Sequence, residues 1–240
     1  HFFIRKMLEP VETAQKKQTQ FIASASHELR TPLAVVRSGL ESVEKCSNEE
    51  ERNYFLHLMS EETVHMKRLI DDMLLLANSD ADTLTIKPEA CQPDLLLLDT
   101  YEKFEPLAKK NGLHLILALP EEILPDCFCD IHRTEQIFSI IVDNALCYTP
   151  SGGKVTLSCH AENEMLCFLF EDTGCGISEE KKSHIFERFY RADDAHTDRE
   201  HFGLGLCIAK ELTEKQNGNI QVVDAPISGS CFMVQLPCAL

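Results

Sequence analysis

The sequence has 240 residues, and 44% of them are hydrophobic, which is enough for two modest domains with apolar cores. Its 39 acidic residues outnumber its 23 basic residues, so the formal net charge is −16. Such a surface repels phosphate backbones, and we therefore expect no direct binding to nucleic acid. A helix needs about 18 consecutive apolar residues to cross a bilayer, and the sequence contains no such run.

Eleven cysteines are scattered along the chain, and none belongs to a Cys-x-x-Cys pair. We therefore expect no zinc site, and we interpret the one close pair, Cys127 and Cys129, as incidental. An odd number of cysteines without a disulfide framework is typical of a reducing cytosol.

The sequence starts with histidine, so we expect it to be part of a longer protein. Residues 1–9 are predicted to be a membrane-proximal segment: the end of a membrane helix, followed by Arg5 and Lys6 on the cytoplasmic side. A frayed, partly apolar terminus explains the same residues equally well.

Two long amphipathic helices are predicted next, from about residue 10 to 46 and from about residue 50 to 78, joined by a short turn. Their seam positions recur in steps of four and three, as in helices that pack side by side. The seams are Leu29, Leu33, Val36, Leu40 and Val43, and Phe55, Met59, Glu62, Met66, Leu69, Met73 and Leu76. One hairpin cannot bury both seams, so we expect residues 10–78 to form a dimeric four-helix bundle. The alternative is a hairpin that folds back on the second domain.

His27 and Thr31 are four residues apart and therefore share one face of the first helix. Pro32 removes the hydrogen bond that its N–H would give to the Glu28 carbonyl, and it crowds that carbonyl. A histidine beside such a kink, in an otherwise well-built helix, suggests a functional role. Taken alone, a surface histidine with a tolerated proline is the simpler explanation.

Residues 79–83 break the helical periodicity and are the predicted linker. The remaining residues, 84–240, show a mixture of helical and strand patterns that predicts an α+β sandwich, with helices on one face of a sheet. Helices are predicted over 93–110, 130–148 and 203–216, and strands over 84–87, 113–119, 154–160, 165–171, 219–224 and 231–236.

The predicted helix 130–148 carries Asn144 on its apolar face, with Tyr148 one turn later. An amide oxygen can ligate magnesium, a hard cation that prefers oxygen and bridges phosphates. A hydrogen-bonded core asparagine is the alternative explanation.

Two glycine-containing motifs follow. Asp172, Gly174 and Gly176 come after a strand, where a carboxylate can accept a hydrogen bond from an exocyclic amine and the glycines allow a close backbone approach. A tight turn explains this motif about as well. The segment 203–205 opens a helix, and the free N–H groups at a helix N-terminus favour phosphate.

Together these motifs resemble, in order and spacing, those of the sensor histidine kinases of two-component systems, from about residue 10 to residue 237. The matching segments are His27-Glu28-Leu29-Arg30-Thr31-Pro32, Asp143-Asn144-Ala145 with Tyr148, Asp172-Thr173-Gly174-Cys175-Gly176, Ile185 to Arg191, and Phe202-Gly203-Leu204-Gly205. The resemblance implies a long antiparallel helical hairpin that forms a dimeric four-helix bundle, followed by an α/β sandwich of the GHKL (Bergerat) ATPase type. Gyrase, Hsp90 and MutL share that ATP-binding fold but lack the motif around His27.

The resemblance also implies roles for individual residues. His27 would be the phosphoacceptor, Glu28 would orient its ring or take its proton, and Thr31 would position water for a phosphatase reaction. Asn144 would hold Mg²⁺, and Asp172 would hold the adenine amino group of ATP. The nucleotide-binding set is Asn144, Tyr148, Asp172, Gly174, Gly176, Arg191, Gly203, Leu204 and Gly205. For Arg191, a surface arginine is an equally good explanation.

Four positions depart from the family pattern. Ile140 stands where the family usually has an asparagine, and Cys147 where it usually has a lysine. Glu200 and His201 stand where glycines are common. Loss of the lysine removes a positive charge near the phosphates, so we expect weaker nucleotide binding rather than loss of the site.

The resemblance therefore predicts an ATP- and Mg²⁺-dependent protein-histidine kinase that acts as a homodimer. It would pass its phosphoryl group to the receiver domain of a response regulator and would be the cytoplasmic portion of a bacterial plasma-membrane protein with a transmembrane sensor region. The alternatives are a degenerate kinase that serves as a docking scaffold or phosphatase, and a gyrase- or Hsp90-like mechanical ATPase.

Overall fold

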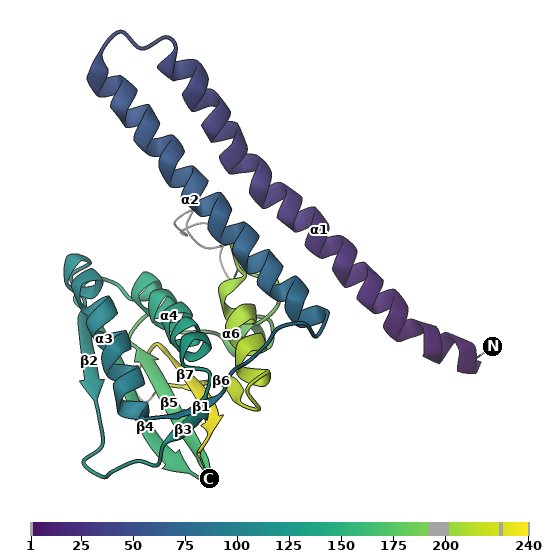
Figure 1. The fold of residues 1–240 in the computed structure, drawn as a ribbon, viewed down its shortest axis with the longest axis vertical. Coiled ribbons are helices and arrows are strands. Elements are labelled where there is room, and N and C mark those ends of the chain that lie inside the picture. The colour runs from purple at the N-terminus through teal and green to yellow at the C-terminus, as the bar shows by residue number, and fades with distance from the viewer. Residues whose placement is uncertain (1, 192–201, 226–227, 240) are drawn as a thin grey trace. The chain divides into compact units, whose positions relative to one another are not determined.

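The computed structural model describes residues 2–191, 202–225 and 228–239. It contains two compact units, of which one ends at Leu75 and the other begins at Leu76. The first unit is an antiparallel helical hairpin, formed by α1 (Phe2–Val43) and most of α2 (Glu49–Asp80) (Figure 1). Among the described residues, no helix combines the length and the apolar composition that a membrane crossing requires.

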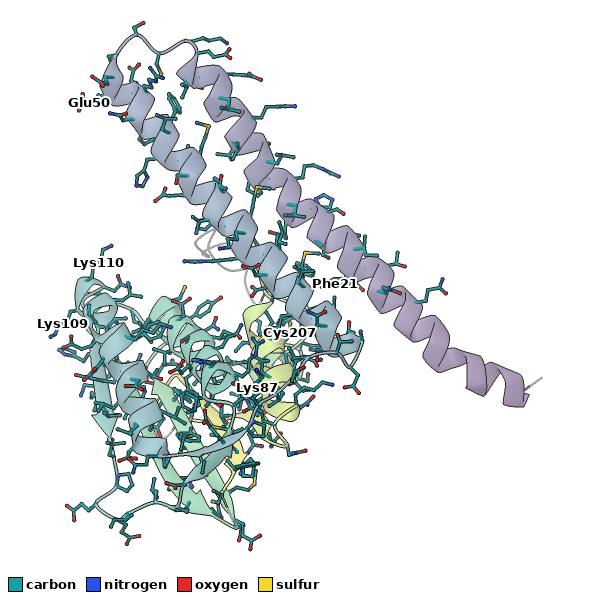
Figure 2. The ribbon with its side chains drawn as sticks, viewed as in Figure 1. Phe21, Glu50, Lys87, Lys109, Lys110 and Cys207 are labelled. Atoms are coloured by element: carbon teal, nitrogen blue, oxygen red, sulfur yellow. The ribbon has the colours of Figure 1, made fainter. Side chains whose placement is uncertain are left out.

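The turn between the two helices ends at a cap residue, Asn48. Oδ1 of Asn48 accepts a hydrogen bond from the backbone N–H of Glu51 at 2.7 Å, which satisfies one of the free donors at the start of α2. The first turn of α2 holds Glu49, Glu50 and Glu51, whose negative charges interact favourably with the positive end of the helix dipole (Figure 2). The sequence therefore specifies where α2 begins.

Small residues on α1 allow it to approach α2 closely. Ala25, Pro32 and Gly39 are buried and repeat every seven residues. A Cβ atom on Gly39 would lie only 2.6 Å from Cγ of Met59 on α2, so the two helices touch at this level. α1 continues through Pro32 without interruption.

The predicted seam of α2 is buried or half-buried throughout, as expected. The seam predicted for α1 is buried only in part within one hairpin, as expected if it also packs against a second copy. Leu29 and Val36 are half-buried, whereas Leu33 and Leu40 are 57% and 55% exposed. In this single chain, α1 thus presents a second apolar face that α2 does not cover.

The second unit is built on a five-stranded sheet in the order β2-β4-β5-β7-β6. Its strands are β2 (His114–Ala118), β4 (Lys154–Glu162), β5 (Met165–Asp172), β6 (Asn219–Asp224) and β7 (Ser230–Pro237). β2 and β4 are parallel, and the other neighbours are antiparallel. Two short strands, β1 (Glu89–Cys91) and β3 (Cys127–Cys129), form a separate antiparallel pair.

Three helices cover one face of this sheet, as predicted: α3 (Pro93–Lys110), α4 (Ile131–Tyr148) and α6 (Gly205–Glu214) (Figure 1). The core between the layers is centred on Phe138 of α4, whose ring centroid lies 4.8 Å from that of Phe168 and 5.0 Å from that of Phe170. All three side chains are fully buried. Lys109 and Lys110 lie at the C-terminal end of α3, where their positive charges interact favourably with the negative end of the helix dipole (Figure 2).

The strand predicted over 84–87 is wrong. These residues have no regular structure, and the strand begins at Glu89 instead. The backbone N–H of Lys87 donates to Oδ2 of Asp130 at 2.9 Å, and Pro88 has no N–H to give to a neighbouring strand. The sequence reading also missed β3 and the single-turn helix α5 (Glu179–Lys182).

Candidate functional site

The candidate phosphoacceptor lies on the hairpin. His27 and Thr31 are both exposed on α1, while Glu28 between them is half-buried. Pro32 packs inward and, having no N–H, leaves the carbonyl of Glu28 without its usual helical hydrogen bond. That carbonyl and the exposed imidazole of His27 lie within about one turn of each other. A ring in this position can be reached from solvent by another molecule or domain.

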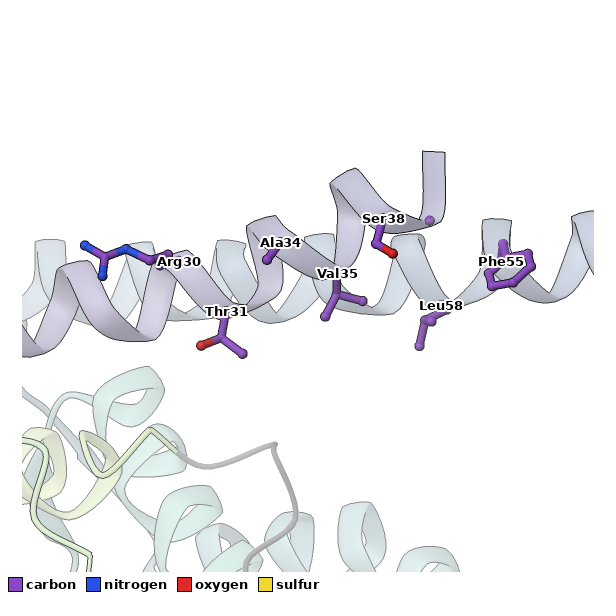
Figure 3. A pocket seen from close by; sticks show the side chains of 8 residues that line it. Arg30, Thr31, Ala34, Val35, Ser38, Phe55 and Leu58 are labelled. Carbon is purple, nitrogen blue, oxygen red and sulfur yellow. The ribbon is translucent and has the colours of Figure 1, made fainter. Parts of the chain in front are cut away.

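A groove runs along the same hairpin beside Thr31, with a volume of about 540 Å³ (Figure 3). Arg30, Thr31, Ala34, Val35, Ser38 and Gly39 line it from α1, and Phe55 and Leu58 line it from α2. Its walls are mostly apolar, with Arg30 and Thr31 at one end. The groove therefore begins one turn from His27 and offers a surface on which a protein could rest.

The candidate nucleotide site begins with Asn144 on α4. Its Nδ2 donates to the carbonyl oxygen of Ile140, one turn earlier, at 2.8 Å. Because the amide nitrogen must face that carbonyl, the amide orientation is fixed, and Oδ1 is left as an acceptor for something outside the helix. Asn144 is half-buried, so the oxygen is positioned but can be reached.

Asp172 closes strand β5 and is only 5% exposed. Its Oδ1 accepts from the backbone N–H of Gly174 at 2.8 Å and from that of Ser230 at 3.3 Å. Burial raises the pKa of this carboxyl, and hydrogen bonds from the backbone of Gly174 and from the backbone and side chain of Ser230 partly offset the rise. Both backbone bonds go to Oδ1, which anchors the carboxylate at the end of β5.

The glycines of this region permit contacts that no side chain would allow. A Cβ atom on Gly174 would lie 2.5 Å from the carbonyl oxygen of Tyr148, so the motif after β5 abuts the end of α4. A Cβ atom on Gly229 would lie 1.9 Å from the carbonyl oxygen of Asp172. Gly176, at φ +74°, sits next to Gly229. The structure thus brings Tyr148, Asp172, Gly174 and Gly176 together.

Replacing Gly229 by alanine is expected to destabilise the second unit, because φ at this position is +92° and the new methyl group would overlap the backbone of Asp172. The left-handed conformation alone should cost about 1–2 kcal/mol, and the overlap adds to it. Gly152→Ala is the matched control, since φ there is +85° and nothing lies within 4 Å of the built Cβ. Urea unfolding should show a larger loss for Gly229→Ala, and equal losses would contradict the close approach.

The segment 203–205 leads into α6 as predicted, although the helix proper begins only at Gly205. Gly203 has φ +73°, and its carbonyl oxygen accepts from the backbone N–H of Phe189 at 2.9 Å. Leu204 is the N-cap residue; it is buried and makes no side-chain cap. A Cβ on Gly205 would lie 3.1 Å from Cγ2 of Ile140, so α6 begins directly beside the turn of α4 that holds Asn144.

The departures from the family pattern have different structural settings. Ile140 fills space against Gly205, and its carbonyl anchors Asn144. Cys147 is exposed. Glu200 and His201 lie outside the described residues, so the expectation for them remains a prediction.

Arg191 is half-buried and stands at the end of the described stretch that precedes residue 202. The sequence reading missed Arg188, three residues earlier. Its guanidinium donates two hydrogen bonds to the carboxylate of Asp80, at 2.8 and 2.7 Å, and this pairing lowers the pKa of Asp80. Nearby, the Ser79 hydroxyl donates to Glu211 at 2.7 Å, and Lys215 pairs with Asp82. The end of α2 is thus tied to α6 and to the segment around Arg188 within the second unit.

Comparisons with known proteins agree with this arrangement. Residues 17–82 match the His Kinase A (phospho-acceptor) domain, and residues 129–240 match the histidine kinase-, DNA gyrase B- and HSP90-like ATPase. Sensor histidine kinase RppB of Synechocystis is 33% identical over 234 residues, covering 96% of this chain and 51% of RppB. WalK of Bacillus subtilis is 33% identical over 233 residues, covering 94% of this chain and 38% of WalK. The chain thus spans about half or less of the length of these curated relatives.

Solved structures share the fold. Histidine kinase AdeS of Acinetobacter baumannii has a TM-score of 0.71 at 22% identity, covering 89% of this chain and 98% of that chain. Full-length ShkA in complex with AMPPNP has a TM-score of 0.70 at 28% identity, covering 92% of this chain and 46% of that chain. Histidine kinase ThkA in complex with response regulator TrrA has a TM-score of 0.70 at 19% identity, covering 97% of this chain and 67% of that chain.

Fold and site together define a protein with a phosphoacceptor helical hairpin, followed by an ATPase domain of the GHKL type. The chain belongs to the sensor histidine kinases of two-component systems.

Proposed function

We propose that this chain is an ATP-dependent protein-histidine kinase that phosphorylates its own His27 and passes the phosphoryl group to an aspartate of a response regulator. The observation that carries the proposal is the set of contacts around Asp172. An anchored, buried carboxylate stands beside glycines that no side chain could replace, at the end of the helix that holds Asn144. Such a set fits a purine nucleotide.

In this proposal Asp172 accepts a hydrogen bond from the adenine amino group. Gly174 and Gly176 let the base lie close to the backbone, and the ring of Tyr148, which is 43% exposed, can contact the nucleotide. The segment 203–205 and the N-terminal end of α6 face the phosphates. Arg191 contributes positive charge to the phosphates, as the family resemblance implies.

Asn144 is the proposed Mg²⁺ ligand. Its amide nitrogen is held by the Ile140 carbonyl, so the oxygen is the atom it offers to a ligand, and an oxygen is what Mg²⁺ prefers. When bound, the ion would neutralise charge on the phosphates of ATP.

On the hairpin, a neutral nitrogen of the exposed His27 ring attacks the γ-phosphorus of ATP in line, the bond to the β-phosphate oxygen breaks, and ADP leaves. The ring proton is lost after or during this step, and Glu28 is the proposed acceptor or orienting group. Thr31 is proposed to position water for dephosphorylation. Most of the rate enhancement would come from holding the two reactants in line.

The proposed partners are a second copy of this chain and the receiver domain of a response regulator. For the homodimer, the support is the second apolar face of α1, with Ile22, Leu33 and Leu40 all more than half exposed in the single chain. α2 adds exposed Leu56, Ile70 and Leu74. For the regulator, the support is the kinase–regulator complex formed by ThkA with TrrA. The chain would work as the cytoplasmic part of a longer, membrane-bound sensor.

The test is incubation of the chain with Mg²⁺ and γ-labelled ATP. We expect incorporated label that survives alkali and is lost in acid, which distinguishes phosphohistidine from phosphoserine. ATP binding by calorimetry without any incorporated label would favour a degenerate kinase that acts as a docking scaffold or phosphatase. Absence of both binding and label would contradict the proposal.

The proposal also predicts a pH dependence of ATP binding. Because burial raises the pKa of Asp172, this carboxyl becomes protonated at a higher pH than an exposed aspartate does, and a protonated carboxyl donates where adenine needs an acceptor. ATP affinity should therefore be full above the raised pKa and should fall as the pH drops through it. Calorimetry over a pH series checks this, with Asp172→Asn measured in parallel to account for protonation of the nucleotide phosphates. Identical pH profiles for the two proteins would contradict the assigned role.

A further inference from the structure

Three cysteine thiols converge beside the main sheet, at the β1–β3 pair. Cys91 lies on β1, and Cys127 and Cys129 lie on β3. Cys91 is directly opposite Cys127 in the antiparallel register, and Cys129 is two residues further along the same strand. Residues that alternate along a strand point to the same face, so all three side chains project to one side.

The sulfur atoms are close enough to share one ion. All three lie within 4.8 Å of one another, and Sγ of Cys91 is 3.4 Å from Sγ of Cys129. A metal ion bound at about 2.3 Å to each of three thiolates requires sulfur–sulfur separations of about 3.8 Å. Small rotations of the side chains would therefore convert the observed cluster into a three-thiolate site.

The surroundings suit a positive ion. Cys127 and Cys129 are fully buried, whereas Cys91 is half-buried, which leaves one route from solvent. The carboxylates of Asp126 and Asp130 lie near enough to act electrostatically on the thiols of Cys91 and Cys129. The hydroxyl of buried Thr134 hydrogen-bonds to the Cys129 sulfur and would hold that ligand in place, as second partners do at metal sites.

We propose that Cys91, Cys127 and Cys129 bind one thiophilic d¹⁰ metal ion, either Zn²⁺ or monovalent copper. Binding replaces three S–H bonds by three sulfur–metal bonds and releases one proton per thiol. Thiolates select these ions over Mg²⁺ or Ca²⁺. Charge favours Zn²⁺, which leaves a smaller net negative charge on the buried site; a ligand count of three favours monovalent copper, because Zn²⁺ needs a fourth ligand such as water.

The spacing of Cys127 and Cys129 alone does not indicate a metal site. The third cysteine, Cys91, precedes Cys127 by 36 residues, a spacing that matches no short metal-binding motif. The site also bears on the nucleotide domain, because Cys129 directly precedes Asp130, whose carboxylate caps α4 and accepts from the Lys87 backbone. A bound ion would therefore tie β1 to the strand that starts the nucleotide-binding helix.

The test uses the full chain, reduced with a phosphine and freed of metal. It is titrated with Zn²⁺ against a chromophoric chelator and, in a separate anaerobic arm, with monovalent copper against a copper(I)-specific chelator. We expect one tightly held ion per chain in at least one arm, and the arm that binds identifies the ion. Cys91→Ala, which alters the half-buried ligand, should weaken binding at least tenfold, while Cys46→Ala, in the turn of the hairpin, should leave it unchanged.

A second measurement does not depend on folding of the variants. In the wild-type chain the bound ion should protect Cys91, the half-buried thiol of the three, from alkylation, as mapped by mass spectrometry, and should raise the melting temperature. No bound ion in either arm, equal binding by wild type and Cys91→Ala, or protection of other cysteines instead would overturn the proposal.

Discussion

Replacing His27 with glutamine is expected to abolish all incorporation of phosphate from ATP. Glutamine keeps the length and hydrogen-bonding character of the side chain but has no nucleophilic ring nitrogen, so no phosphoryl bond can form at this position. His27 is exposed on α1, and its replacement should leave the packing between the helices intact. The measurement is acid-labile label on the protein after incubation with γ-labelled ATP and Mg²⁺, together with ATP affinity by calorimetry.

The hairpin offers a matched control for this experiment. His57 on α2 has a side chain that is 74% exposed and lies 3.5 Å from Glu61, so His57→Gln tests whether any surface histidine of the hairpin accepts phosphate. We expect full labelling of His57→Gln and none of His27→Gln, with unchanged ATP affinity in both. Label retained in His27→Gln would refute the assigned phosphoacceptor, and lost ATP affinity would show that the substitution acts through the second unit.

The local motifs could be read from the sequence because each is short and chemically distinctive. Asp172 and Gly174 are two residues apart, and the structure joins them by a hydrogen bond. The cap at Asn48 and the end of α3 followed from residue type and order in the same way. The long helices were predictable because periodicity accumulates over many turns.

The remaining features depend on residues that are far apart in the chain. The pairing of Asp80 with Arg188 spans 108 residues, and the sequence around either residue does not predict it. β3 has three residues, which is too few to show an alternating pattern, and the strand predicted over 84–87 fails because a distant carboxylate, that of Asp130, takes the Lys87 N–H. Periodicity alone also does not divide the apolar residues of α1 between two faces, because steps of three and four do not specify which neighbouring helix each residue contacts.

Asparagine in place of Asp172 is expected to remove most of the affinity for ATP while leaving the fold intact. The amide oxygen can still accept from the backbone of Gly174 and Ser230, so the turn after β5 should persist. Facing the ligand, however, an amide NH₂ meets the adenine NH₂, and two donors oppose each other. Loss of a hydrogen bond to a charged group is worth roughly 1.5–3 kcal/mol, which corresponds to a Kd about 10- to 150-fold higher.

Stability should move in the opposite direction to affinity, and this separates a binding role from a structural one. Burial raises the pKa of Asp172, so the ionised carboxylate is less favourable in the folded chain than in the unfolded one. The protonated carboxyl therefore favours folding at low pH, and this contribution to the free energy of unfolding is lost as the pH rises through the raised pKa. Removing the charge should therefore leave the free energy of unfolding at neutral pH equal or higher. Glu171→Gln is the control, because the neighbouring side chain on β5 points to the other face of the sheet and should change neither quantity. A variant Asp172→Asn that binds ATP normally, or that loses binding only because it unfolds, would show that this carboxylate is kept for the turn rather than for the nucleotide.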